Sequence, residues 1–149
     1  MSVKTSIVKA KDVMRRDVVT IDGMATVREA VTKMRSENVT ALVVDKRHPN
    51  DAWGIVTIPD LVRDVIAPRR SPDDTHVYEV MTKPVISADP SDSIQQCMET
   101  MTTCRCRHLP IVNDGKLLGI VSIGDLVKKM LDEKEIEVEQ LSQYITGTY

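Results

Sequence analysis

The sequence contains no phenylalanine, and its aromatic residues make up only 3% of 149 residues. Apolar residues nevertheless reach 42%, so a hydrophobic core has to be built from Val, Ile, Leu and the adaptable side chains of the eight Met. A chain of this length suits a single compact domain or two small interlocked ones.

The sequence also lacks a basic excess and a long apolar run. Lys plus Arg number 20 and Asp plus Glu number 22, which gives a formal charge of −2. Nucleic-acid binding as the main role is disfavoured, because such binding needs clustered cations to neutralise phosphates. No apolar run approaches the roughly 18 residues that span a bilayer, and the N-terminus lacks the apolar segment of a signal peptide. We therefore expect no membrane partner.

Cysteines are few, and they occur only at Cys97, Cys104 and Cys106. Three cysteines without a paired spacing are typical of a reducing compartment, so we expect a cytoplasmic protein. Cys104-x-Cys106-x-His108 offers thiolate and imidazole groups to Zn²⁺, but its spacing matches no common structural zinc pattern. A thiol nucleophile is disfavoured because the sequence suggests no third, orienting group. There is also no glycine-rich phosphate loop, so we predict no metal site and no catalysis.

A nine-residue segment occurs twice in the chain. Residues 54–62 read Gly-Ile-Val-Thr-Ile-Pro-Asp-Leu-Val, and residues 119–127 read Gly-Ile-Val-Ser-Ile-Gly-Asp-Leu-Val. Further upstream, Asp-Val-Met at 12–14 matches Glu-Val-Met at 79–81. A repeat this tight indicates two copies of one unit, related by pseudo-symmetry.

Each copy is predicted to be a β-α-β-β-α unit, which makes the fold class α/β (α+β). Short β-branched runs predict first strands, and capping boxes at Thr26 and Ser93 predict the helices that follow. Asn-Asp-Gly at 113–115 predicts a tight hairpin turn. The expected strands are 18–20, 41–45 and 53–57 in the first copy, and 85–87, 109–113 and 116–122 in the second. The domain boundaries follow as 8–66 for unit 1, 67–75 for the linker, 76–131 for unit 2 and 132–149 for a C-terminal helical extension.

The repeated Thr/Ser-x-x-Asp allows two interpretations. At a strand-to-helix junction, Thr57 with Asp60, or Ser122 with Asp125, would serve as a capping box that satisfies free N–H groups. The same helix start suits an anionic ligand, and an Asp there can accept two hydrogen bonds from a ribose diol. The two roles are compatible, and spacing alone does not separate them.

The ordered set of motifs resembles a pair of CBS domains, the modules first described in cystathionine β-synthase. The resemblance covers about residues 8–130. It rests on the Asp-Val-Met opening, the capped helix, Arg-His-Leu-Pro-Ile-Val at 107–112 and the doubled Gly-Ile-Val-Thr/Ser-x-x-Asp. It implies two units packed through their sheets into a Bateman module. It also implies clefts between the units for adenosine-containing ligands such as AMP, ADP, ATP or S-adenosylmethionine.

The resemblance also implies composite sites, because the Asp and hydroxyl of one unit would face strands of the other. Asp60 would hold the ribose diol, and the backbone near Ile86 would read the adenine edge. Arg107 and His108 resemble the basic pair that meets phosphates, so we expect this cleft to be the stronger phosphate site. The complete first cleft would use Thr57, Asp60, Thr82, Val85, Ile86, Arg107 and His108.

The second cleft departs from this pattern. Thr40 and Ala41 stand where the first cleft has Arg107 and His108, so a basic pair is missing unless Arg15 or Arg16 supplies charge. The residues carried over to this cleft are Val18, Val19, Val39, Thr40, Ser122 and Asp125.

We therefore predict a non-catalytic regulatory sensor that binds an adenine nucleotide between two CBS units, with no obligatory cofactor. A homodimer is expected, together with a regulated protein partner that the sequence does not identify. The alternatives are a purely structural or dimerisation module with empty clefts, or a sensor for S-adenosylmethionine or NAD-type ligands. The basic pair at 107–108 favours a ligand, because helix capping does not require it.

Overall fold

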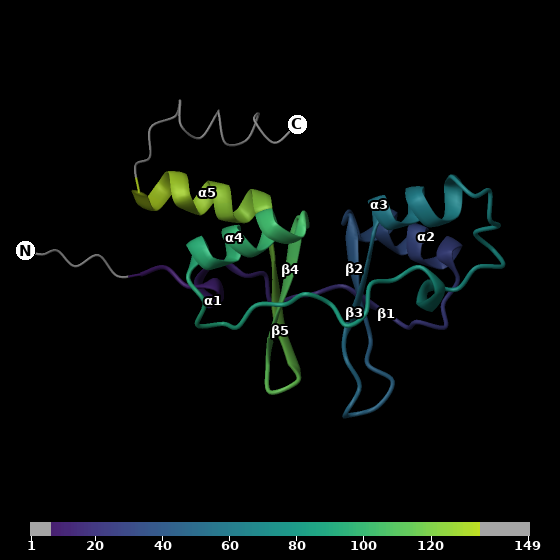
Figure 1. The fold of residues 1–149 in the computed structure, drawn as a ribbon, viewed down its shortest axis with the longest axis horizontal. Helices are drawn as coiled ribbons and strands as arrows, with labels where there is room; N and C mark the ends of the chain where they lie inside the picture. Colours follow the sequence, from purple (N-terminus) through teal and green to yellow (C-terminus); the bar gives the residue numbers. More distant parts are fainter. Residues whose placement is uncertain (1–6, 135–149) are drawn as a thin grey trace, which may run out of the picture. The chain divides into compact units, whose positions relative to one another are not determined.

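The computed structural model describes residues 7–134 of the chain, and Figure 1 shows their helices and strands. They form two compact units, which we describe separately. The 17–86 unit consists of residues 17–86 together with 114–116. The 87–134 unit consists of 87–113 and 117–134 together with the N-terminal residues 7–16. The N-terminal segment therefore packs with the second copy of the repeat.

A three-stranded sheet organises the 17–86 unit, in the order β1-β2-β3. Strand β1 (Thr20–Ile21) is parallel to β2 (Ala41–Val44), which is antiparallel to β3 (Gly54–Thr57). Ala41 pairs with Thr57 and Val44 with Gly54, so Thr57 lies at the end of the sheet where β2 begins.

The helices of the 17–86 unit cover this sheet. Helix α2 (Val27–Glu37) begins at the predicted capping box, where Thr26 Oγ1 accepts from the Glu29 N–H. Helix α3 (Ile58–Leu61) follows β3 and widens into a π-helical turn (Val62–Ile66), and a short 3₁₀ helix lies at Val77–Glu79. Leu42, Val56 and Val65 belong to the buried core between sheet and helices. The i, i+3, i+4 spacing of Val27, Ala30 and Val31 predicts a buried stripe on α2, but Val31 is 44% exposed.

A β-hairpin, apart from residues 114–116 at its tip, and three helices make up the 87–134 unit. Strands β4 (His108–Asn113) and β5 (Lys116–Ser122) join through Asp114 and Gly115, whose φ angles of 53° and 75° are those of the predicted tight turn. The helices are α1 (Ala10–Val13), α4 (Ile94–Cys104) and α5 (Ile123–Lys134).

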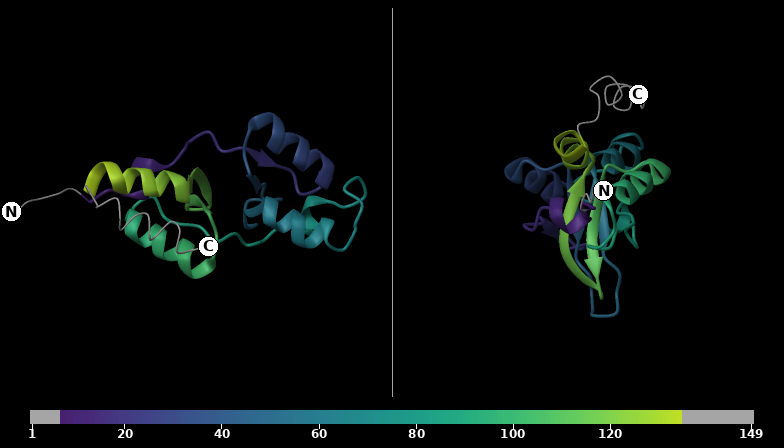
Figure 2. Two further views of the ribbon diagram at one scale, coloured as in Figure 1. Left: turned by 90° about the horizontal axis from the view of Figure 1, so that it is seen from above. Right: turned by 90° about the vertical axis from the view of Figure 1, so that its left-hand side faces the viewer.

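Helices α4 and α5 lie side by side over the hairpin of the 87–134 unit (Figures 1 and 2). The capping box of Ser93 with Gln96 begins α4 as predicted. Buried Met101, Leu109, Val121 and Leu126 join the helices to the strands. The predicted C-terminal helical extension lies largely outside the described residues, since α5 is described only as far as Lys134.

The predicted strand at 85–87 is wrong. Only an isolated parallel bridge joins Ala88 to Ile111 in this part of the described chain. The physical reason lies in the backbone of the preceding segment, because the Val85 N–H donates to the Trp53 carbonyl at 2.9 Å, beside β3. Pro84 and Pro90 flank the segment and have no N–H to offer to a ladder. The β-α-β-β-α pattern thus keeps its first strand as a ladder in one copy and as a single bridge in the other.

Candidate functional site: two hydroxyl–carboxylate pairs at helix starts

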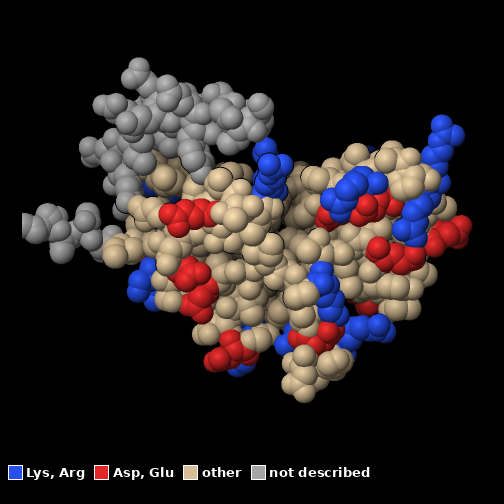
Figure 3. Space-filling view, viewed as in Figure 1, with Lys and Arg blue, Asp and Glu red and all other residues tan. Residues whose placement is uncertain are grey.

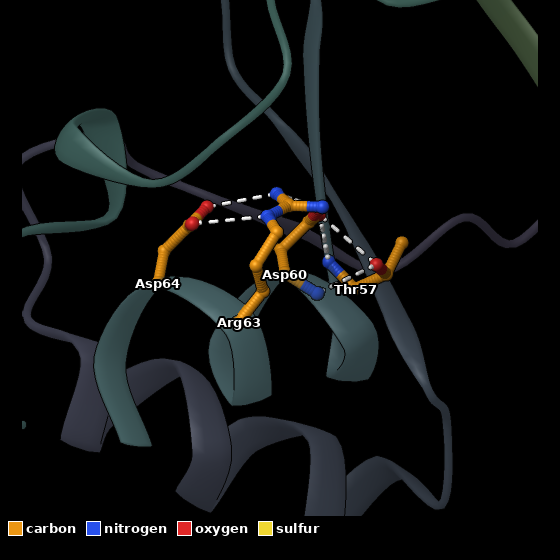
Figure 4. A network of polar contacts seen from close by, with 4 residues as sticks. All are labelled: Thr57, Asp60, Arg63 and Asp64. Atoms are coloured by element: carbon orange, nitrogen blue, oxygen red, sulfur yellow. Dashed lines mark hydrogen bonds and ion pairs between the residues drawn. The ribbon is translucent and has the colours of Figure 1, made fainter. Parts of the chain in front are cut away.

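Thr57 and Asp60 form the first candidate site, at the junction of β3 and α3 (Figure 4). The Thr57 N–H and Oγ1 both donate to Asp60 Oδ2 at 2.9 Å, and the Asp60 N–H lies 3.4 Å from Thr57 Oγ1. The reciprocal bonds are those of a capping box, so the helix-capping interpretation is correct for this pair. Asp60 is only 8% exposed.

The other oxygen of the same carboxylate carries a cation. Arg63 Nη2 donates to Asp60 Oδ1 at 3.0 Å, while Arg63 Nε and Nη2 hold both Asp64 oxygens at 2.9 and 2.8 Å. These bonds raise the pKa of Arg63, first through Asp64 and then through Asp60, and they lower the pKa of Asp64. Figure 4 shows the guanidinium between the two carboxylates. The sequence reasoning did not single out Arg63; its spacing of three residues from Asp60 on a helix was the available signal.

Three further predicted site residues belong to the same unit as Asp60. Thr82 forms an antiparallel bridge with Ile55 of β3, and Val85 donates to the Trp53 carbonyl. Ile86 follows and is 42% exposed. These residues of the first predicted cleft therefore belong to one unit but lie along the length of β3: Thr57 and Asp60 at its C-terminal end, and Val85 beside Trp53, just before its N-terminal end.

Gly54, the first residue of the repeated segment, explains how residues 81–82 come so close to β3. A Cβ at Gly54 would stand 3.3 Å from the Thr82 carbonyl oxygen and 3.0 Å from Met81 Sδ. In the second copy, a Cβ at Gly119 would stand 2.7 Å from both the Arg15 carbonyl oxygen and Met14 Sδ. Both glycines thus permit a close backbone approach to the strand that ends in the hydroxyl–carboxylate pair.

Ser122 and Asp125 form the matching pair at the junction of β5 and α5. The Ser122 N–H donates to Asp125 Oδ2 at 3.3 Å, and the Asp125 N–H donates to Ser122 Oγ at 3.2 Å. Arg15 Nε lies 3.6 Å from Asp125 Oδ2, and the Arg15 backbone pairs with Ile120. Arg15 is thus an ion-pair partner of this carboxylate, and a contribution of Arg15 or Arg16 to the second predicted cleft stays a prediction. Its position matches that of Thr82, since each directly follows the Met of the Asp/Glu-Val-Met match.

Arg107 and His108 also lie beside Ser122 and Asp125 in the 87–134 unit. The Ile123 N–H donates to the Arg107 carbonyl at 2.9 Å, and His108 is the first residue of β4. Burial lowers the pKa of His108, and Arg107 acts in the same direction, while Asp125 opposes them. The basic pair is therefore close to the Asp125 pair within one unit. Its place opposite Asp60 stays a prediction.

The remaining residues of the second predicted cleft belong to the 17–86 unit. Thr40 accepts from the Ile58 N–H at 3.2 Å, Val39 donates to Met34, and Val19 accepts from the Val43 N–H. Val18 is half-buried near the start of the unit. The structure thus places Thr40 beside the end of β3 in its own unit, and the meeting of these residues with Asp125 stays a prediction.

The cysteines are placed as small apolar residues more than as ligands. Cys97 is buried in the core of the 87–134 unit, and burial raises the pKa of its thiol to about 11. Burial also raises the pKa of Cys106, whereas Cys104 is exposed. Among the described side chains, which end at residue 132, no three of His, Cys, Asp or Glu gather where a metal ion could be held. None of the helices described is long and apolar enough to cross a membrane.

Comparison with known proteins gives consistent matches. The CBS domain family matches residues 10–67 and 77–132. The CBS domain-containing protein CBSX3, mitochondrial, from Arabidopsis thaliana is 39% identical over 127 residues, which are 83% of this chain and 62% of that protein. The chain thus spans less than two thirds of this relative's length.

Two solved structures extend the comparison. A hexameric CBS-CP12 protein from bloom-forming cyanobacteria is 34% identical with a TM-score of 0.82, covering 90% of this chain and 75% of that one. A CBS domain protein from Pyrobaculum aerophilum complexed with AMP is 26% identical with a TM-score of 0.71, covering 79% of this chain and 89% of that one.

Proposed function

Because this chain belongs to the CBS-domain family, with a matched CBS domain in each half, we propose that it is a non-catalytic regulatory module that binds an adenosine-containing ligand. One observation carries the proposal. The same hydroxyl–carboxylate pair begins α3 and α5, and each carboxylate has an arginine beside it. A carboxylate at this place can accept both hydroxyls of a ribose, and the nearby cations suit phosphates. The AMP complex of the Pyrobaculum protein supports this ligand class.

The distribution of charge agrees with a small ligand. On the face shown in Figure 3, Lys and Arg side chains of the 17–86 unit stand among Asp and Glu side chains. A nucleic-acid surface would instead gather cations on one face. The cations that matter for the proposal, Arg15, Arg63, Arg107 and His108, are those near the two carboxylates.

The proposal is tested by thermal melting with AMP, ADP, ATP, NAD and S-adenosylmethionine. A ligand that binds only the folded protein stabilises it by about 2.7 kcal/mol at 100 times its Kd. For a chain near 150 residues, that stabilisation raises Tm by roughly 5–10 °C. The ligand that gives the largest shift identifies the adenosyl compound.

Variants locate the ligand. Asp60→Asn and Asp125→Asn keep the shape of the side chain but remove its charge, so each should remove the affinity of its own site. Asp22→Asn is a matched control, because Asp22 caps a turn through the Met24 N–H near the opposite end of the sheet from Thr57. Retained affinity in the double variant Asp60→Asn/Asp125→Asn would contradict the assignment of both sites.

A purely structural or dimerisation module is the second candidate, and two observations favour it. The capping bonds give both carboxylates a structural role without any ligand. In addition, Ile58, Val62 and Ile66 expose 39%, 50% and 66% of their surface along α3 and the π-helical turn. A homodimer would cover such an apolar stripe, and the cyanobacterial CBS-CP12 protein is itself hexameric.

The same measurements separate the candidates. A dimer mass by light scattering, with no thermal shift for any of the five ligands, favours the structural module. A ligand-dependent shift favours the sensor, and a change of mass with ligand would connect the two roles. We also propose the cytoplasm as the compartment, which cell fractionation tests; the named Arabidopsis relative is mitochondrial.

A further inference from the structure

The two carboxylate oxygens of Asp60 have different partners, and only one of them caps the helix. Oδ2 accepts both bonds from Thr57, whereas Oδ1 accepts only from Arg63 among the described residues. Loss of the Oδ1 bond would leave the cap of α3 intact. Oδ1 is therefore the oxygen through which a ligand would be recognised, and in this structure the Arg63 guanidinium lies on it.

Asp64 holds Arg63 in that position. Its two oxygens grip Nε and Nη2 in a bidentate pair, while the Arg63 side chain as a whole is 63% exposed. An exposed side chain is not fixed by packing, so the two carboxylates decide where the guanidinium rests. Residues 62–66 form a π-helical turn, an irregularity that often accompanies functional sites.

The second copy has no such arrangement. The positions that match Arg63 and Asp64 are Lys128 and Lys129, on the regular helix α5. An acidic residue to hold the cation is therefore missing from the matching place, and the arginine near Asp125 comes from the N-terminal segment at Arg15. The feature belongs to the Asp60 copy alone.

We propose that Arg63 acts as a latch on Asp60: its guanidinium occupies Oδ1 until a ligand displaces it. This competition makes the Asp60 site selective for phosphorylated nucleosides over unphosphorylated ones. The inference rests on the proposed function. A ribose diol has to displace the guanidinium from Oδ1 before it can bind there. A phosphate compensates for this loss, because a guanidinium pairs with phosphate as it does with carboxylate. A nucleoside without phosphate offers no such replacement.

The test compares adenosine with AMP by calorimetry, in an Asp125→Asn background that silences the other site. In Arg63→Ala, adenosine should bind about two- to fivefold tighter, the worth of a partly exposed ion pair. AMP should lose its phosphate partner, so that the preference for AMP over adenosine falls about tenfold. Arg28→Ala is the matched control, since it removes an arginine ion pair with Asp73 elsewhere in the same unit. It should leave the preference unchanged.

A second variant tests the role of Asp64. Asp64→Asn should tighten AMP binding severalfold, because the phosphate then no longer competes with the Asp64 carboxylate for Arg63. Each melting curve verifies that the variants are folded.

The outcomes separate the latch from the proposed function. If the Asp125→Asn parent binds AMP, and adding Arg63→Ala leaves the preference for AMP over adenosine unchanged, the latch is refuted while the nucleotide site stands. An equal fall in Arg28→Ala also refutes it, because the effect would then be one of general charge. If neither the parent nor Arg63→Ala binds adenosine or AMP, the nucleotide site at Asp60 is refuted together with its latch.

Discussion

Replacing Gly119 by alanine tests whether the repeated glycine exists to let another segment approach β5. An added Cβ would stand 2.7 Å from the Arg15 carbonyl oxygen, a separation that Cβ atoms do not adopt. That oxygen cannot retreat easily, because Arg15 and Ile120 exchange two backbone hydrogen bonds of 2.9 Å. The added Cβ therefore clashes with backbone atoms that these hydrogen bonds hold in place.

The expected cost follows from two opposing terms. Overpacking of this kind costs about 1–3 kcal/mol. Alanine also restricts the unfolded chain relative to glycine, which returns about 0.4–1 kcal/mol. The net loss for Gly119→Ala is then about 1–2 kcal/mol, or roughly 3–6 °C in Tm for a chain of this size.

Denaturant unfolding followed by circular dichroism measures the loss, and Gly124→Ala is the control. At Gly124, in α5, the nearest atom to an added Cβ is Ser122 Oγ at 3.9 Å. That variant should gain up to about 1 kcal/mol, because alanine is the better helix former. Gly54→Ala should lie between them, since its closest contact is the flexible Met81 Sδ at 3.0 Å. Equal stability of Gly119→Ala and Gly124→Ala would refute the reasoning.

Three further predictions concern capping, pH and thiol chemistry. Thr57→Ala should lower the free energy of unfolding by about 0.5–2 kcal/mol, because it removes the hydroxyl that caps α3. Thr57→Ser keeps a hydroxyl and should retain most of the original stability. An unchanged free energy of unfolding in Thr57→Ala would contradict the capping role. Burial holds the pKa of His108 below its usual 6.5, so the unfolded chain binds a proton at His108 more readily than the folded chain does. The contribution of neutral His108 to stability is therefore complete above pH 6.5, and it is lost as the pH falls below 6.5 and through the lowered pKa of the folded state. His108→Gln should flatten that part of the stability profile, and an identical profile would count against it. In thiol labelling of the folded protein, exposed Cys104 should react first, while buried Cys97, with its raised pKa of about 11, should react only on unfolding; rapid labelling of Cys97 would show that the core is open.

The parts of the fold that were predictable depend on local chemistry. Thr26 and Ser93 cap helices because a hydroxyl can bond an N–H three residues onward, and the Asp114–Gly115 turn needs residues that tolerate positive φ. The stripe rule failed at Val31, because hydrophobic spacing marks one face of a helix but does not say how far a neighbouring element covers it. The strand predicted at 85–87 does not form, because the Val85 N–H bonds with the carbonyl of Trp53, just before β3.

The residues of the candidate site likewise divide into those that local sequence chemistry identifies and those that it does not. Thr57 with Asp60, and Ser122 with Asp125, were identifiable because each pair lies within one helical turn and occurs twice. Arg63 was within reach of the same spacing argument, but its bond to Asp60 Oδ1 and its grip by Asp64 depend on side-chain positions that sequence does not specify.

By itself the sequence determined the duplication, the helix-strand-strand-helix order that both copies share, and the two capping pairs, because periodicity and capping act over a few residues. Only the tertiary structure decided which distant segments lie against β3 and β5. Thr82 is 27 residues from its partner Ile55, and Arg15 is more than 100 residues from Ile120. A backbone approach over such separations depends on the whole fold, and it is this approach that places Arg15 beside Asp125.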